Sequence, residues 1–246
     1  MEEPTIRELS RFDSKTYVRL VTYLRQVYRI VPLCDIPNED VPCLILRHDI
    51  DLSLESALKM AEIESDMGVR STYFVLLSSG IYNSFDGKNV EMIRQISGLG
   101  HEIGLHYDVN QYERYGGDND QSLEMELKAL GLISGKRVRS ISSHAPRRPS
   151  SFLNISNCIS ADDPRLREVY VHDSQRLWAI KSLTILLNDS PRRVQLAIHP
   201  CLWIPSVRRS HGQTKLDLAL LDVLSLLNTL RTLAIRVIHS RESCEN

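Results

Sequence analysis

The sequence predicts an α/β fold, a single barrel-like domain of about seven mainly parallel strands. Two observations support this prediction. Short apolar, β-rich runs alternate along the chain with segments of helical spacing, which is the pattern of successive βα units. Aspartate and histidine residues follow the apolar runs where these end, and parallel α/β folds bind ligands at the carboxyl ends of their strands. The length of 246 residues suits one such domain.

The first half of the chain alternates helices and strands. Apolar residues at helical spacing predict a helix over 14–30, with Ser14 as its N-cap, and three prolines then form a connector. The apolar run 41–51 ends in polar residues and predicts a buried parallel strand. A helix is expected over 53–67, where one apolar stripe ends at a glycine, and the β-rich run 71–77 predicts the next strand.

The same alternation continues to the carboxyl end of the sequence. Strands are expected over 101–107, 137–146, 167–174 and 193–200, and helices over 89–100, 122–133 and 215–235. A polar, glycine-rich loop is expected over 110–120. We therefore expect one domain over 1–246. Within it, 1–40 form an N-terminal helix and connector, 41–205 form the motif-bearing barrel and 206–246 form a C-terminal helix.

Composition excludes several classes of protein. The formal net charge of −1 lacks the basic excess of a protein that binds nucleic-acid phosphates. The sequence contains no run of about 18 apolar residues, so no transmembrane helix is predicted. The charged residues 1–15 do not resemble the apolar core of a signal peptide. Five widely spaced cysteines predict reduced thiols rather than a disulfide framework. We expect a cytoplasmic protein with no nucleic-acid partner and no integral membrane segment.

Aspartate and histidine residues collect where the predicted strands end. Because the carboxyl ends of parallel strands meet at one rim, we expect these side chains to converge. Carboxylate oxygen and imidazole nitrogen suit zinc and other first-row divalent ions. Beside such a metal, a second carboxylate can act as base and a separate histidine as acid. The residues concerned are Asp49, Asp51, His106, His144, His172, Asp173 and His199.

Strand parity separates the candidates by face. Side chains alternate along a strand, so Asp49 and Asp51 are expected on one face and His48 on the other. His101 and His106 differ by five positions and are expected on opposite faces of their strand. His106, at the carboxyl end, is therefore the site candidate, and His101 is expected to be structural.

Five segments of the chain occur in an order that resembles a known family: LRHDID, GHEIGLHYD, SSHAP, HDSQRLW and LAIHP. They resemble the motifs of the polysaccharide deacetylase family, carbohydrate esterase family four. The RHDxD form of the first motif resembles a branch found in surface-polysaccharide and O-antigen biosynthesis. The resemblance covers residues 41–205, and GHEIGLH is its most specific part. It implies a distorted (β/α) barrel and a metal-dependent hydrolase that removes an N-acyl, usually N-acetyl, group from a sugar.

The resemblance implies roles for individual residues. Asp49 matches the aspartate that acts as general base on the attacking water. Asp51 matches the metal-binding aspartate, displaced by one position from the usual adjacent pair, and His106 matches the first histidine ligand of the metal, expected to be zinc. His199 matches the histidine that protonates the leaving amine. Asp173 lies in the motif whose carboxylate tunes that histidine.

The sequence departs from the family at the second metal histidine. That residue lies four positions after the first, where this chain has Asn110. We expect His144 to supply the third ligand, at a strand end where the family usually has an arginine that orients the base. His48 is a second alternative, which strand parity disfavours. A third alternative is that the protein has lost the metal and is an inactive, carbohydrate-binding relative.

The surroundings of the motifs give some indication of the substrate. For a cytoplasmic protein, we expect a nucleotide-linked or lipid-linked sugar rather than finished wall polymer. Arg147, close to His144, could bind a diphosphate, and Trp203 and Tyr107 could stack on a sugar ring. Hydrolysis of an amide or ester on a non-sugar substrate is a further alternative on the same barrel.

Overall fold

The structure is a computed structural model that describes residues 4–37, 41–115, 118–144, 158–174 and 180–205. The chain divides into two compact units, Met1–Ser206 and Val207–Asn246, and the second unit lies outside the described residues. The helix expected over 215–235 lies in that second unit, so it stays a prediction. The expectation of one domain over 1–246 stays a prediction as well.

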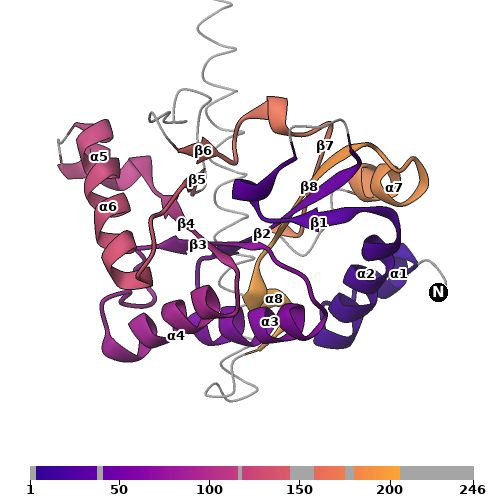
Figure 1. Cartoon of the computed structure of the whole chain (residues 1–246), viewed down its shortest axis with the longest axis horizontal. Coiled ribbons are helices and arrows are strands. Elements are labelled where there is room, and N and C mark those ends of the chain that lie inside the picture. The colour runs from indigo at the N-terminus through magenta and orange to yellow at the C-terminus, as the bar shows by residue number, and fades with distance from the viewer. Residues whose placement is uncertain (1–3, 38–40, 116–117, 145–157, 175–179, 206–246) are drawn as a thin grey trace, which may run out of the picture. The chain divides into compact units, whose positions relative to one another are not determined.

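The described part of the chain holds eight strands in one curled, half-barrel sheet (Figure 1). Seven of them follow the order β6-β5-β4-β3-β2-β8-β7, and β1 pairs with the first residues of β2. Each of these pairings is parallel. The predicted distorted (β/α) barrel of mainly parallel strands is therefore confirmed. The bounds are β1 Arg29–Val31, β2 Cys43–Ile50, β3 Thr72–Leu76, β4 Glu102–Tyr107, β5 Ser140–Ser143, β6 Ile159–Ser160, β7 Val169–His172 and β8 Arg193–Ile198.

Helices cover the sheet on its outer side and at both ends. In Figure 1, α3 and α4 run along one side, α5 and α6 lie beyond β4, and α1, α2 and α7 gather at the opposite end. Within the described ranges, no helix is both long and apolar enough to cross a membrane. The helical segments are α1 Ile6–Leu9, α2 Ser14–Val27, η1 Leu33–Asp35, α3 Leu54–Asp66, α4 Gly87–Gly98, α5 Val109–Tyr115, α6 Asn119–Ser134, η3 Pro164–Leu166, α7 Ile180–Asn188 and α8 Pro200–Trp203.

Three local predictions need correction. The helix expected over 14–30 ends at Val27, because 29–31 pair with β2 as a strand. Its N-cap is Asp13 rather than Ser14, since the Asp13 carboxylate accepts a hydrogen bond from the Thr16 backbone N–H at 2.8 Å.

The loop expected over 110–120 contains most of helix α5. Asp108 starts that helix, because its carboxylate accepts a hydrogen bond from the Asn110 backbone N–H at 3.0 Å.

The expectation of reduced thiols agrees with the structure over the described residues, where Cys34, Cys43, Cys158 and Cys201 are free.

Strand alternation gives the sheet two chemically different faces. The outer face packs against α3, α4 and α6 through buried side chains such as Tyr73, Leu105 and Tyr107. The inner face carries a smaller apolar cluster that includes Ile45 and Phe74. Odd-numbered residues of β2 lie on the inner face, so the strand carries Asp49 inward, toward the concave side of the half-barrel.

Candidate active site

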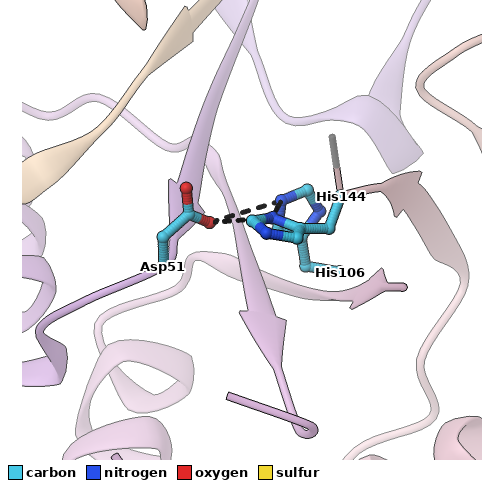
Figure 2. A group of neighbouring side chains, drawn as sticks. All are labelled: Asp51, His106 and His144. Atoms are coloured by element: carbon cyan, nitrogen blue, oxygen red, sulfur yellow. Dashed lines mark hydrogen bonds and ion pairs between the residues drawn. The ribbon is translucent and has the colours of Figure 1, made fainter. Parts of the chain in front are cut away.

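Neighbouring strands bring the predicted metal ligands to one rim of the sheet. Asp51 follows β2, His106 is the penultimate residue of β4, and His144 follows β5. His106 lies beside Ser142 in the parallel register of β4 and β5, which places His144 just beyond it. The curl of the sheet allows these side chains to meet Asp51 across the intervening strand β3 (Figure 2).

The three side chains form a compact group, which we call the Asp51 triad. Asp51 Oδ1 lies 3.4 Å from His106 Nε2 and 3.5 Å from His144 Nδ1, and the two nitrogens are 3.3 Å apart. Figure 2 shows both imidazoles converging on one oxygen of Asp51. Around a tetrahedral zinc with ligands at about 2.0–2.1 Å, the ligand–ligand edges are about 3.3–3.4 Å. The triad therefore fits three corners of a tetrahedral metal site.

The surroundings of the triad prepare its atoms for a metal. His106 Nδ1 lies 3.0 Å from the carbonyl oxygen of Ser142, so in the neutral imidazole the proton is held on Nδ1 and the lone pair of Nε2 faces Asp51. Asp51 Oδ1 is buried and accepts no hydrogen bond from the described residues. Burial would raise the pKa of Asp51, but His106, His144 and His199 hold it well below its usual value. Asp51 is thus an anionic ligand in need of a cation.

Asp49 lies on the same face of β2 as Asp51 and is held by Arg47. Arg47 Nη2 donates to Asp49 Oδ2 at 2.7 Å, and both side chains are buried. Burial would raise the pKa of Asp49, but Arg47, followed by His106 and His199, lowers it. Asp49 Oδ1 is buried and has no hydrogen bond within the described residues. One oxygen is therefore fixed, while the other can accept a proton.

Arg47 is itself held between aromatic rings. Its guanidinium carbon lies 5.4 Å from the ring centroid of Phe74 and 5.8 Å from that of Tyr170. Phe74 needs the space beside Gly104, because a Cβ at Gly104 would lie 2.5 Å from the Phe74 ring. The sequence interpretation missed Arg47, although it lies two positions before Asp49 and strand parity places both on one face.

His199, Asp173 and Trp203 form a second group at the same rim. His199 Nδ1 lies 2.6 Å from Asp173 Oδ1, and the Trp203 indole N–H donates to Asp173 Oδ2 at 2.7 Å. The other imidazole nitrogen, Nε2, lies 3.5 Å from Asp51 Oδ2. Burial would lower the pKa of His199, but Asp173 outweighs this effect and, with Asp51 and Asp49, raises the pKa to about 10. His199 is therefore positioned as a proton donor next to the triad.

The residues expected to contact a sugar are placed differently from that expectation. Trp203 and Tyr107 are fully buried, so neither offers an exposed ring face. Trp203 packs behind Asp173, and Tyr107 follows His106 in β4 and therefore points to the helix-covered outer face. Arg147 lies outside the described residues.

Neither Asn110, at the position of the family's second metal histidine, nor the alternative ligand His48 joins the triad. Asn110 lies in α5, where its side-chain amide donates to Asp108 Oδ1 at 2.7 Å. His48 points to the outer face, as parity predicts, with its Nε2 2.7 Å from Glu64 Oε1. His101 also lies beside Glu64, in agreement with a structural role. We call this buried group the Glu64 cluster; it comprises Tyr17, His48, Glu64, Ser71, Tyr73 and His101.

Comparisons with known proteins find similar solved structures. No protein-family model and no curated protein matches the chain. A variant of a CE4 family pseudoenzyme from Bacillus anthracis, with restored enzymatic activity, is 13% identical, with 79% of this chain and 64% of that chain covered and a TM-score of 0.45. This chain thus spans less than two thirds of the pseudoenzyme structures that it matches.

Two further solved structures are matched over a larger share of their own length. A family 4 carbohydrate esterase from Bacillus anthracis is 15% identical, with 84% of this chain and 85% of that chain covered and a TM-score of 0.42. The catalytic domain of a peptidoglycan N-acetylglucosamine deacetylase from Eubacterium rectale is 11% identical, with 80% and 88% covered and a TM-score of 0.44.

Proposed function

We propose that the protein is a metal-dependent carbohydrate N-deacetylase, which hydrolyses an N-acyl group, in particular N-acetyl, on a sugar. The observation that carries this proposal is the arrangement around Asp51. One carboxylate oxygen faces two imidazole nitrogens at metal-ligand spacing, and the other faces His199 Nε2. Asp49, whose Oδ1 is buried and has no hydrogen bond within the described residues, supplies the base beside this group. A base, a metal site and an acid therefore lie at one rim.

Asp51, His106 and His144 would hold the divalent ion, for which we propose zinc. A divalent ion bound there would supply Lewis-acid activation of water and of the substrate carbonyl. The triad offers three protein ligands, and a catalytic metal site needs a further position open to water and substrate. The side chain of His144, which is 30% exposed, lies on the accessible side of the triad.

The proton transfers are assigned to Asp49 and His199. Asp49 accepts a proton from the attacking water on its free Oδ1, while Arg47 keeps the carboxylate ionised and fixed in orientation. His199 donates a proton from Nε2 to the leaving amine. Asp173 holds the opposite nitrogen and thereby keeps Nε2 directed toward the reaction centre. The base lies in β2 and the acid directly follows β8, the neighbouring strand.

The motifs that resemble the polysaccharide deacetylase family support a sugar as substrate. The RHDxD form of the first motif further supports a role in surface-polysaccharide biosynthesis. For a protein acting in the cytoplasm, we propose a nucleotide-linked or lipid-linked sugar as the substrate. The pathway rests on the sequence resemblance and the linked sugar on the expected cytoplasmic location, whereas the hydrolytic chemistry rests on the geometry of the site.

The alternative is an inactive, carbohydrate-binding relative. Asn110, at the position of the family's second metal histidine, favours it because its amide is engaged by Asp108 and lies in α5. An inactive protein would bind N-acetylated sugars without releasing acetate from them.

Acetate release from N-acetylated sugars tests the proposal. We expect the protein loaded with zinc to release acetate and expose an amine, and Asp49→Asn and His199→Ala to lower kcat about 100-fold or more, since each removes one proton transfer. Asp120→Asn, an exposed carboxylate on α6, is the matched control and should keep full activity. Binding without turnover would support the inactive alternative. Unchanged activity in both variants would overturn the assignment of base and acid, and release from non-sugar amides or esters alone would overturn the substrate class.

A further inference from the structure

A hollow of about 230 Å³ lies at the amino-terminal ends of β3, β4 and β5, and we call it the basic hollow. Its lining includes Arg70, just before β3, and Glu102, the first residue of β4. The Asp51 triad takes His106 from the other end of β4, four residues along, a separation of about 13 Å in a strand. The hollow is therefore distinct from the proposed active site.

Positive charge dominates the lining of the hollow. Arg70 Nη2 pairs with Asp35 Oδ2 at 3.1 Å. Glu102 accepts hydrogen bonds from neutral donors, among them the Thr72 hydroxyl at 2.7 Å. The remaining basic residues, Lys136, Arg137 and Arg139, therefore share the lining with one further carboxylate, that of Glu102, which already accepts hydrogen bonds. The charged lining consists of Arg70, Lys136, Arg137, Arg139, Asp35 and Glu102.

Two arginines of the lining are available to a ligand. Arg137 and Arg139 flank Val138 in the segment just before β5, and both arginines are exposed, whereas Val138 is buried. Neither arginine side chain has a hydrogen bond or ion pair with any residue that the structure describes; the Arg139 backbone carbonyl accepts one from the Ile159 backbone N–H. Lys136 is anchored, because its Nζ donates to the Ser97 carbonyl at 2.7 Å, and an ammonium keeps two further donors.

The one thiol of the lining is not a nucleophile. Burial, followed by Glu102, raises the pKa of Cys34 to about 12, so the thiol stays neutral at physiological pH. A neutral thiol neither attacks a substrate nor binds a metal strongly. The hollow therefore offers cationic donors and no nucleophilic thiol among its described lining, which suits the binding of an anion.

We propose that the basic hollow binds a phosphorylated small molecule by its phosphate groups. A guanidinium group can bind a phosphate through two parallel hydrogen bonds. The positive charges of Lys136, Arg137 and Arg139 repel one another, and a multivalent anion between them relieves this repulsion. The hollow is smaller than the roughly 300–1,000 Å³ pockets that enclose drug-sized ligands, so it holds the phosphate groups while the remainder of the molecule extends outward.

Calorimetric titration with pyrophosphate, and separately with inorganic phosphate, tests this site. The chain is used free of metal, so that chelation by a metal ion at the triad does not contribute. We expect saturable binding of one pyrophosphate per chain, weakened about 10-fold or more in Arg137→Ala/Arg139→Ala. The matched control, Arg114→Ala/Lys128→Ala, removes two exposed charges from α5 and α6 and should bind as the unmodified protein does.

Further measurements distinguish a diphosphate from a monophosphate ligand, and the basic hollow from the Asp51 triad. Tighter binding of pyrophosphate than of phosphate supports a diphosphate ligand, and the reverse order supports a monophosphate. His106→Ala should leave binding unchanged, because the site does not depend on the triad or on the proposed deacetylase activity. Arg139→Gln, with its thermal unfolding measured in parallel, keeps the test decisive if the double variant does not fold. The proposal is overturned if no saturable binding occurs, if the double variant and its control bind equally, or if His106→Ala abolishes binding.

Discussion

Asp173 lies against His199, with its Oδ1 2.6 Å from the imidazole Nδ1. The His199 backbone N–H donates to the same carboxylate, and the Trp203 indole holds its other oxygen. Asp173 is fully buried, so these contacts are shielded from solvent. The imidazole is therefore fixed in one tautomer and one orientation, with Nε2 toward Asp51.

Replacing Asp173 by asparagine should abolish most of the proposed activity. An amide can no longer stabilise the protonated imidazole, so we expect kcat to fall by about 10²- to 10⁴-fold while bound metal is retained. Trp203→Phe keeps the ring and removes only one hydrogen bond to Asp173, so its effect should be smaller. Asp189→Asn, at an exposed position after α7, is the control. Turnover of Asp173→Asn equal to that of the control would show that His199 does not act as the acid.

Bound metal should depend on both histidines of the Asp51 triad. We expect His106→Ala and His144→Ala to lose the ion, because each leaves only two protein ligands. His172→Ala is the matched control: His172 also ends a strand, but it stacks on Tyr170 at 5.3 Å and lies outside the triad. Metal content of the purified variants, measured by mass spectrometry, checks this. Retention of metal by His144→Ala would exclude it as the third ligand.

Strand parity and strand ends explain how much of the site could be predicted from the sequence. Alternation along β2 separates Asp49 and Asp51 from His48, and the structure places them on opposite faces as expected. Parallel pairing then predicts a common rim, at which His106 and His144 meet Asp51. These rules are local, and they hold because backbone hydrogen bonding fixes side-chain direction within a strand.

Contacts between distant elements could not be predicted in the same way. The closeness of Trp203 to His199 in the sequence predicts contact with a sugar, but helix α8 directs the Trp203 ring into the interior. The apolar spacing of helix α2 predicts only packing, yet its Tyr17 reaches Glu64 and lies against Trp203. Such contacts depend on how helices dock, which no spacing within one segment determines.

The buried pair of Arg47 and Asp49 should contribute strongly to stability. Removing one partner leaves an uncompensated buried charge, so we expect Arg47→Met to lower the free energy of unfolding by about 3–5 kcal/mol and to reduce activity. Arg165 pairs with Asp163 at the same sequence separation but is 84% exposed, so Arg165→Met should leave stability unchanged. Urea unfolding of both variants makes the comparison. Equal effects of the two substitutions would contradict the importance of burial for this pair.

The Glu64 cluster should make the fold sensitive to acid. Burial would raise the pKa of Glu64, but His48, His101 and Ser71 lower it to about 2 from 4.5. The ionised Glu64 carboxylate therefore contributes about 3 kcal/mol to the free energy of unfolding above pH 4.5, and this contribution is lost as the pH falls toward 2. Burial lowers the pKa of His101 below 6.5, so stability also declines as the pH falls below that value and the unfolded chain takes up a proton.

Substitution of Glu64 separates its contribution from those of other carboxylates. We expect Glu64→Gln to destabilise the protein at pH 7 and to flatten the decline in stability between pH 4.5 and 2. Glu62→Gln, an exposed neighbour on α3, should follow the unmodified protein at every pH. Urea unfolding across this pH range provides the measurement. A decline of the same steepness in Glu64→Gln would show that other groups cause the acid sensitivity.

Tyr17 should link the N-terminal helix to the acid group of the proposed site. Its hydroxyl donates to Glu64, and its ring lies 5.7 Å, edge to face, from that of Trp203, which in turn holds Asp173. Tyr17→Phe loses only a buried hydrogen bond and should cost about 1–3 kcal/mol of stability with kcat unchanged. Tyr17→Ala leaves a cavity beside Trp203, so we expect a loss of about 3–5 kcal/mol and a lower kcat with KM unchanged. Val27→Ala, at the exposed end of α2, should change neither quantity. A normal kcat in folded Tyr17→Ala would show that Trp203 holds Asp173 without support from the N-terminal helix.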